Sequence, residues 1–233
     1  GIGKTSLFRE IYRTLSDRGA YVISGKFEQF ERVTPYSAIV RALQELVDNI
    51  LTENEAEISL WKRKLMAVLG HNGQIIIDIL PRLELIIGLQ PPVEEVSSVE
   101  AQNRFNQVFE NFIRIFCQSS HPLVIFLDDL QWADGASLKL IELMMTDKEI
   151  KYLFLTCAYR DDEIAPVHPL NRTVAILKKS IKMKEIYLNS LDIEDITQLI
   201  SDTIHTGGDY VRELSKMIKK NTEGNPFFIK QYL

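Results

Sequence analysis

The sequence feature that most constrains the fold is an uninterrupted apolar run at residues 123–127, followed at once by Asp128 and Asp129. Consecutive apolar residues rich in branched side chains are typical of a strand that is buried on both faces. A helix expected at residues 6–16 and a strand expected at residues 20–25 follow one another in the order found in parallel sheets. The chain is therefore predicted to be an α/β protein with a central parallel sheet.

The remaining elements are expected from the spacing of apolar residues. Spacings of three and four predict amphipathic helices, and short runs of branched or aromatic residues predict strands. The expected helices lie at residues 36–51, 58–69, 101–117 and 134–145, and the expected further strands at 152–158 and 185–188. Residues 52–98 break the alternation and are interpreted as a helical insertion. We expect a core over residues 1–190 and the start of a small helical domain, with two or three helices, over residues 191–233.

The composition excludes several classes of function. The 233 residues carry 27 Lys and Arg against 32 Asp and Glu, a net charge of −5, and offer no basic face for nucleic acid. The cysteines, Cys117 and Cys157, indicate neither a disulfide framework nor a zinc cluster. The longest apolar stretch, residues 74–90, is broken by charges and a proline and falls short of the roughly 20 residues of a membrane span. We expect a reduced, cytoplasmic chain with no direct nucleic-acid or membrane partner.

The first residues match the end of a phosphate-binding loop. They supply the last five positions of the pattern G-x-x-x-x-G-K-[ST], so we expect the chain to be a piece of a longer protein. Glycine lets the backbone approach phosphates, and the amide N–H groups at the start of the helix face their charge. Lys4 would reach the outer phosphates and Thr5 would ligate Mg²⁺, whereas an exposed Gly-Lys turn is the alternative. The candidate nucleotide-binding residues are Gly1, Ile2, Gly3, Lys4, Thr5 and Ser6.

Asp128 and Asp129 are the candidate acids of the same site. A carboxylate at the C-terminal end of a parallel strand points into the crevice where ligands bind in open sheets. There Asp128 would hold Mg²⁺, usually through its water, and Asp129 would orient or deprotonate an attacking water. The alternative is that the two acids cap the following helix.

Arg160 follows the next expected strand, directly after Tyr159. A fixed guanidinium at that position would stabilise charge on the terminal phosphate oxygens. The alternative is an ion pair with Asp161 or Asp162. The order of loop, Asp-Asp strand and Arg strand favours one shared crevice for the three motifs.

Together these motifs resemble the AAA-like ATPase modules of the signal-transduction (STAND) class of P-loop NTPases. The likeness covers nearly the whole chain and is closest to modules of large bacterial multidomain serine/threonine and histidine sensor kinases. The resembling stretches are GIGKTSL, SGKFEQFERVTPYSAIVRALQEL, IIGLQPPVEEV, VIFLDDLQWADGASLKLIELM, FLTCAYRDDEI and TEGNPFFIKQYL. The resemblance implies a three-layer P-loop NTPase sandwich, with a helical insertion and the start of a small helical lid domain.

The resemblance also implies roles for individual residues. Asp128 would bind Mg²⁺, Asp129 would assist hydrolysis, and Arg160 would sense the terminal phosphate. Pro226, in the Gly-Asn-Pro turn of the lid, would lie near the nucleotide base and sugar. The strand before the phosphate loop and an upstream segment that helps hold adenine are absent from the sequence, and the lid ends early at Leu233. No Asn-Lys-x-Asp motif for reading guanine occurs, which favours ATP.

The expected function is that of a slow, Mg²⁺-dependent ATPase switch whose output is movement of the lid. Its cofactors would be ATP and Mg²⁺. Its partners would be other domains of the same polypeptide, namely kinase, sensor or histidine-kinase domains, and the pattern also allows a homo-oligomer. The alternatives are a nucleotide-gated scaffold without turnover, an ATPase module of a transcription regulator and, least favoured, a small-molecule phosphotransferase. The last would need a substrate pocket, for which the insertion offers only His71, Arg82 and Glu84.

Two further features are given no role at this stage. The sequence Ser24-Gly25-Lys26 matches half of a phosphate loop, but it ends a strand and lacks the Gly-Lys-Thr order. The histidines have neither the spacing of a metal site nor an adjoining nucleophile, so they are interpreted as surface or hydrogen-bonded groups. These histidines are His71, His121, His168 and His205.

Overall fold

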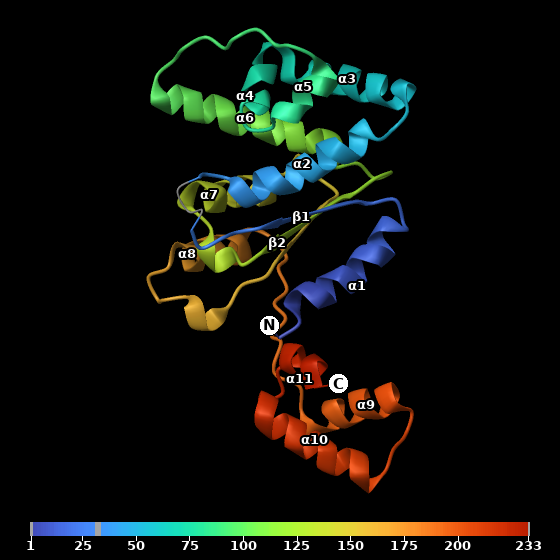
Figure 1. Cartoon of the computed structure of the whole chain (residues 1–233). Coiled ribbons are helices and arrows are strands. Elements are labelled where there is room, and N and C mark those ends of the chain that lie inside the picture. Colours follow the sequence, from blue (N-terminus) through green and yellow to red (C-terminus); the bar gives the residue numbers. More distant parts are fainter. Residues whose placement is uncertain (1, 31–33, 233) are drawn as a thin grey trace. The chain divides into compact units, whose positions relative to one another are not determined.

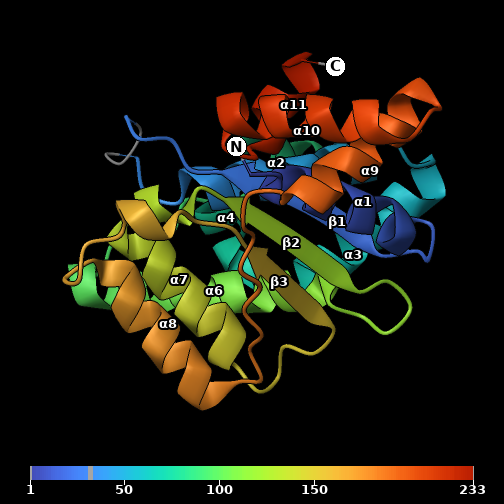
Figure 2. The ribbon, with the colours of Figure 1, turned by 90° about the horizontal axis from the view of Figure 1, so that it is seen from below.

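A parallel sheet of β1 (Tyr21–Lys26), β2 (Leu123–Asp128) and β3 (Leu153–Cys157) organises the larger part of the molecule, with β2 between the other two (Figure 2). The structure, a computed structural model, describes residues 2–30 and 34–232. Every residue of β2 is buried, as the apolar run predicted. The expected α/β class and parallel sheet are confirmed.

The described chain divides into two units. The larger runs from Tyr12 to Met183, and the smaller combines Gly1–Ile11 with Lys184–Leu233. The helices up to the end of the larger unit are α1 (Lys4–Ser16), α2 (Ser37–Leu51), α3 (Glu55–Leu69), α4 (Gly73–Ile77), α5 (Glu84–Ile87), α6 (Ser98–Phe116), α7 (Gly135–Thr146) and α8 (Pro169–Ser180). Short 3-10 turns are η1 (Gly70–Asn72), η2 (Pro81–Leu83), η3 (Leu130–Trp132) and η4 (Asp161–Glu163). Residues 52–98, which were interpreted as a helical insertion, contain α3, α4 and α5.

Helix α2 lies along β1, and the insertion helices lie beyond α2 (Figure 1). The approach of α2 to the sheet is close at Gly25, where an added Cβ would lie 2.0 Å from the carbonyl oxygen of Ala38. A real Cβ cannot occupy that position, because protein interiors are already close-packed. Glycine at position 25 therefore lets the backbone of α2 rest directly on the end of β1.

The core beneath the insertion is rich in aromatic side chains. Phe112 and Phe116 of α6 are fully buried, and the ring of Phe116 stacks on Trp61 of α3 with centroids 5.1 Å apart. Such stacked pairs add to the free energy gained by burying apolar area. The aromatic stripe at residues 105–116 is thus core packing, which also joins the insertion to the sheet.

The expected fourth strand is wrong. Residues 185–188, all of which the structure describes, lie in an irregular segment, and the side chains of Ile186 and Tyr187 are 74% and 69% exposed. A strand needs the backbone of a neighbour to satisfy its hydrogen bonds, and in the described chain this segment does not pair with the sheet. Helix α8, which was not expected, begins instead at Pro169, after His168 accepts a hydrogen bond from the N–H of Leu170.

The smaller unit contains α9 (Ile193–Ile204), α10 (Asp209–Thr222) and α11 (Pro226–Tyr232). Their shared core consists of Ile196, Ile200, Val211, Ile218 and Ile229. The expectation of two or three helices after residue 191 is confirmed. Across the described residues, none of the helices combines the length and apolar character needed to cross a membrane.

Candidate functional site

The carboxyl ends of the three strands are tied together by backbone hydrogen bonds that continue past the strands. The N–H of Phe27 donates to the carbonyl of Asp128 (3.1 Å), and the N–H of Leu130 donates to the carbonyl of Ala158 (2.9 Å). Lys26 and Asp128 are direct partners in the register of β1 and β2. The residues that follow each strand are therefore held at one edge of the sheet, where ligands bind in parallel α/β proteins.

Asp129 turns the chain sharply after β2. Its backbone is left-handed, with φ 53° and ψ 44°, a conformation that aspartate tolerates better than most residues. Its N–H donates to Oδ1 of Asp128 (2.9 Å). Asp128 and Asp129 are only 8% and 7% exposed, so both acids lie close to the interior while remaining at the edge of the sheet.

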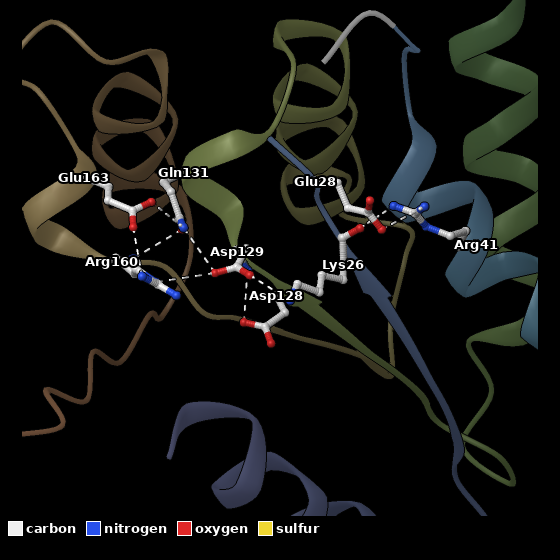
Figure 3. A network of polar contacts seen from close by, with 8 residues as sticks. All are labelled: Lys26, Glu28, Arg41, Asp128, Asp129, Gln131, Arg160 and Glu163. Atoms are coloured by element: carbon white, nitrogen blue, oxygen red, sulfur yellow. Dashed lines mark hydrogen bonds and ion pairs between the residues drawn. The ribbon is translucent and has the colours of Figure 1, made fainter. Parts of the chain in front are cut away.

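Three side chains from three segments surround the carboxylate of Asp129 (Figure 3). Nζ of Lys26 lies 3.2 Å from Oδ2. Oδ1 accepts a hydrogen bond from Nε2 of Gln131 (3.1 Å), and Nε of Arg160 lies 3.9 Å from the same oxygen. Burying a carboxylate is costly unless cations and donors compensate it, and these groups do so here. In the structure both cations are thus engaged by carboxylates of the same edge, Lys26 by Asp129 and Arg160 by Asp129 and Glu163.

Arg160 begins the turn after β3 and is held by acids on two sides. Its Nη1 lies 3.0 Å from Oε1 of Glu163, in addition to the longer contact with Asp129. The carboxylate partners are thus Glu163 and Asp129, in place of the expected alternatives Asp161 and Asp162. With 47% of its side chain exposed, the guanidinium remains accessible to a ligand.

The alternative role for the two acids, as a helix cap, is not what the structure shows. The cap of α7 is Asp134, whose Oδ1 accepts a hydrogen bond from the N–H of Ser137 (2.9 Å). Asp128 and Asp129 precede that cap by a full 3-10 turn, η3. Their position is consistent with binding a ligand at the edge of the sheet.

Sequence reasoning missed three members of this site, namely Lys26, Gln131 and Glu163. Lys26 belongs to the stretch Ser24–Lys26 that was given no role, and its backbone carbonyl also accepts a hydrogen bond from Nη2 of Arg41 on α2 (2.5 Å). The available signal was a lysine at the end of a strand next to the Asp-Asp strand. That signal depends on knowing which strands are neighbours.

The structure brings together Asp128, Asp129 and Arg160 in the larger unit. The candidate residues Ile2, Gly3, Lys4, Thr5, Ser6 and Pro226 belong to the smaller unit, and Gly1 lies outside the described residues. Gly3 has φ 97°, which glycine adopts readily, and Lys4, Thr5 and Ser6 form the first turn of α1. Pro226 is the first residue of α11. The convergence of both groups on one ligand stays a prediction.

The chemistry of the residues present fits Mg²⁺ and a phosphate chain. Mg²⁺ prefers oxygen ligands and keeps several waters, so it is bound through one or two carboxylates together with phosphate oxygens. Asp128 supplies one such carboxylate at the end of β2, and Thr5, which was predicted as a hydroxyl ligand, belongs to the smaller unit. The described residues contain no group of three or more His, Cys, Asp or Glu arranged as a protein-only metal cage.

Comparisons with known proteins give a consistent result. A family model described as "AAA ATPase domain" matches residues 1–156. Hybrid signal transduction histidine kinase G of Dictyostelium discoideum is 29% identical over 296 aligned residues that cover 100% of the chain. Histidine protein kinase 1 of Candida albicans is 22% identical over 157 residues that cover 60% of it. The chain spans 8% of the first relative and 6% of the second. No solved structure matches it.

Proposed function

The chain belongs to the AAA ATPase domain family, and from this premise we propose that it is the ATP-binding, Mg²⁺-dependent ATP-hydrolysing switch module of a larger signalling protein. The observation that carries the proposal is the meeting of Asp129, Lys26 and Arg160 at the carboxyl ends of three parallel strands. A carboxylate at that edge can orient an attacking water, and the two cations can stabilise charge on a phosphate. The finer assignment, to the STAND class, rests on the DDLQWAD, AYRD and GNPFF stretches.

The proposed division of labour follows the chemistry of each group. Lys4 and the backbone of residues 1–6 bind the phosphates, and Thr5 and Asp128 hold Mg²⁺. When bound, Mg²⁺ neutralises charge on the phosphate oxygens. Asp129 orients the attacking water and takes up its proton. Arg160 contacts the terminal phosphate, and Pro226 packs near the base and sugar.

Arg160 is the residue through which the proposed switch distinguishes ATP from ADP. In the structure its guanidinium is shared between Asp129 and Glu163, and it is exposed enough to exchange these acids for a phosphate oxygen. A ligand shifts a conformational equilibrium only through different affinities for the two states. ATP, which has a terminal phosphate for Arg160, and ADP, which lacks it, therefore favour different positions of the residue 160 loop. We propose that this difference moves the lid that begins at about residue 191.

The wider context is proposed from the relatives. Their names describe histidine kinases, and the chain covers a small part of each. We propose a cytoplasmic module whose partners are other domains of the same polypeptide, among them histidine-kinase or serine/threonine-kinase domains. The proposed domain limits are residues 1–190 for the ATPase core and 191–233 for the start of the lid.

A second candidate is a nucleotide-gated scaffold that binds ATP or ADP without turnover. It is favoured by one observation, because both carboxylate oxygens of Asp129 already contact Lys26, Gln131 or Arg160. A base held in this way is a poor acceptor unless its partners move. The scaffold would retain unhydrolysed ATP in the presence of Mg²⁺.

The test uses the intact protein and two substitutions. Lys4→Ala should abolish ATP binding, whereas Asp129→Asn should retain binding and lose hydrolysis. Binding is measured with a fluorescent ATP analogue and hydrolysis by phosphate release. Equal ATPase rates in the wild type and both variants would refute the ATPase, and bound ATP that stays intact in the wild type would favour the scaffold.

A further inference from the structure

Gln131 is the most buried polar side chain near the proposed site, with 1% of the residue exposed. It lies in η3, between the end of β2 and the turn that carries Arg160. Both ends of its amide are in use. Nε2 donates to Oδ1 of Asp129 (3.1 Å) and to Oε2 of Glu163 (3.0 Å), while Oε1 accepts a hydrogen bond from the backbone N–H of Arg160 (3.3 Å).

These contacts close a ring. The guanidinium of Arg160 bridges the same two carboxylates as the amide of Gln131, through Nη1 to Glu163 and Nε to Asp129 (Figure 3). The order around the ring is Asp129, Gln131, Glu163, Arg160 and back to Asp129. A closed set of contacts restricts its members more than separate pairs do, because none can move without breaking two contacts.

The backbone of Gln131 is anchored as well. Nε2 of His168 lies 3.0 Å from the carbonyl oxygen of Gln131, and Nδ1 of His168 accepts the N–H of Leu170 at the start of α8 (3.2 Å). Since Nδ1 accepts, the proton of the neutral ring lies on Nε2, which donates to Gln131. The turn containing Gln131 is thereby fixed to α8 as well as to the residue 160 loop.

Only an amide satisfies this arrangement. The position between Asp129 and Glu163 requires two N–H donors, and the N–H of Arg160 requires an acceptor on the same side chain. Glutamate at position 131 would place a third carboxylate beside those of Asp129 and Glu163, and it would offer neither of them a hydrogen-bond donor. Leucine has a similar size but would leave the N–H of Arg160 and both acids without this partner.

We propose that Gln131 is the positioning residue of the ATPase site: it orients the carboxylate of Asp129 and defines the starting position of Arg160, from which the guanidinium can move to a phosphate, without itself touching nucleotide or metal. This inference rests on the proposed function. It extends that function by giving the acid and the arginine a common support, so that hydrolysis and terminal-phosphate sensing depend on one side chain.

The test is a double-mutant cycle in the intact protein. Gln131→Leu should lower kcat about tenfold or more, because small misplacements of catalytic groups are costly, and should change ADP affinity little. Made in an Arg160→Ala background, it should lower kcat by a clearly smaller factor, since residues in one network are non-additive. A purely structural role would give the same factor in both backgrounds.

A second variant covers the case in which Gln131→Leu does not fold. Glu163→Gln lies at the exposed side of the ring, removes the charge that holds Arg160, and should also lower kcat less in the Arg160→Ala background. Two results would overturn the inference. One is a kcat of Gln131→Leu equal to that of the wild type, and the other is a loss of kcat by the same factor in the wild-type and the Arg160→Ala backgrounds. If the wild type shows no Lys4-dependent ATPase, the proposed function fails. If the wild type shows Lys4-dependent ATPase activity and Gln131→Leu has the same kcat, only the inference about Gln131 fails.

Discussion

Lys26 and Asp129 join the ends of two neighbouring strands, with Nζ of Lys26 3.2 Å from Oδ2 of Asp129. The two side chains differ in environment, since that of Lys26 is 60% exposed and that of Asp129 only 9%. The exposed ammonium group of Lys26 therefore neutralises the buried carboxylate of Asp129. A phosphate placed at this edge would compete with Asp129 for the same ammonium group.

Replacing Lys26 by methionine removes the charge and keeps most of the stem. We expect kcat for ATP to fall about tenfold, which corresponds to one charge-assisted hydrogen bond of about 1.5 kcal/mol. The melting temperature should fall only modestly, because Lys26 is exposed and Gln131 and Arg160 still compensate the buried carboxylate of Asp129. Phosphate release and thermal unfolding are measured together, with Lys26→Arg as the charge-preserving control. An unchanged kcat in Lys26→Met would contradict the role of this pair.

Arg160→Ala separates recognition of ATP from recognition of ADP. The variant should lose about tenfold or more in affinity for ATP and much less for ADP, because only ATP offers the terminal phosphate. Equilibrium binding of both nucleotides measures the ratio. Arg172→Ala, on the exposed side of α8, is the matched control and should leave both affinities as they are. A parallel loss for ATP and ADP would show that Arg160 does not sense the terminal phosphate.

Gly25→Ala tests the contact between β1 and α2. The added Cβ would lie 2.0 Å from the carbonyl of Ala38, so we expect a loss of stability of roughly 1–3 kcal/mol or more from overpacking. Gly135→Ala is the matched control, because a Cβ there meets nothing within 4 Å at the start of α7. Urea denaturation of both variants gives the comparison. Equal midpoints for the two variants would rule out the close approach.

The cysteines should be unreactive in the folded protein. Desolvation raises the pKa of the buried Cys117 and of the half-buried Cys157 to about 12, so both thiols stay protonated up to well above pH 9. The thiolate is the nucleophile, and labelling by iodoacetamide at pH 8 should therefore be slow until urea unfolds the chain. Mass spectrometry of the labelled protein measures this. Rapid stoichiometric labelling of the native state would show that these sites are open.

The sheet was predictable where the sequence itself carries the signal. The apolar run at residues 123–127 is typical of a buried strand, and the acids after it fall at the ligand-binding edge by topology. Lys26 was not predictable in the same way, because its proximity to Asp129 depends on β1 and β2 being neighbours. Gln131 was missed for a related reason, since its partners Glu163 and Arg160 follow a different strand.

The errors in the helices and strands have a physical origin too. Residues 185–188 have the local character of a strand, but local character does not tell whether a neighbour is present to pair with them. Helix α8 was overlooked because Pro169 and the polar residues around it obscure the apolar spacing, although proline is common at the first position of a helix. Both cases depend on partners distant in sequence.

The bare contact at Gly25 links helix α2 to the site. No side chain lies between Gly25 at the end of β1 and Ala38 in the first turn of α2, and Nη2 of Arg41 donates to the backbone carbonyl of Lys26. A displacement of the first turn of α2 would therefore have to carry the backbone of Lys26 with it. Such a displacement would change the point from which the Lys26 side chain reaches Asp129.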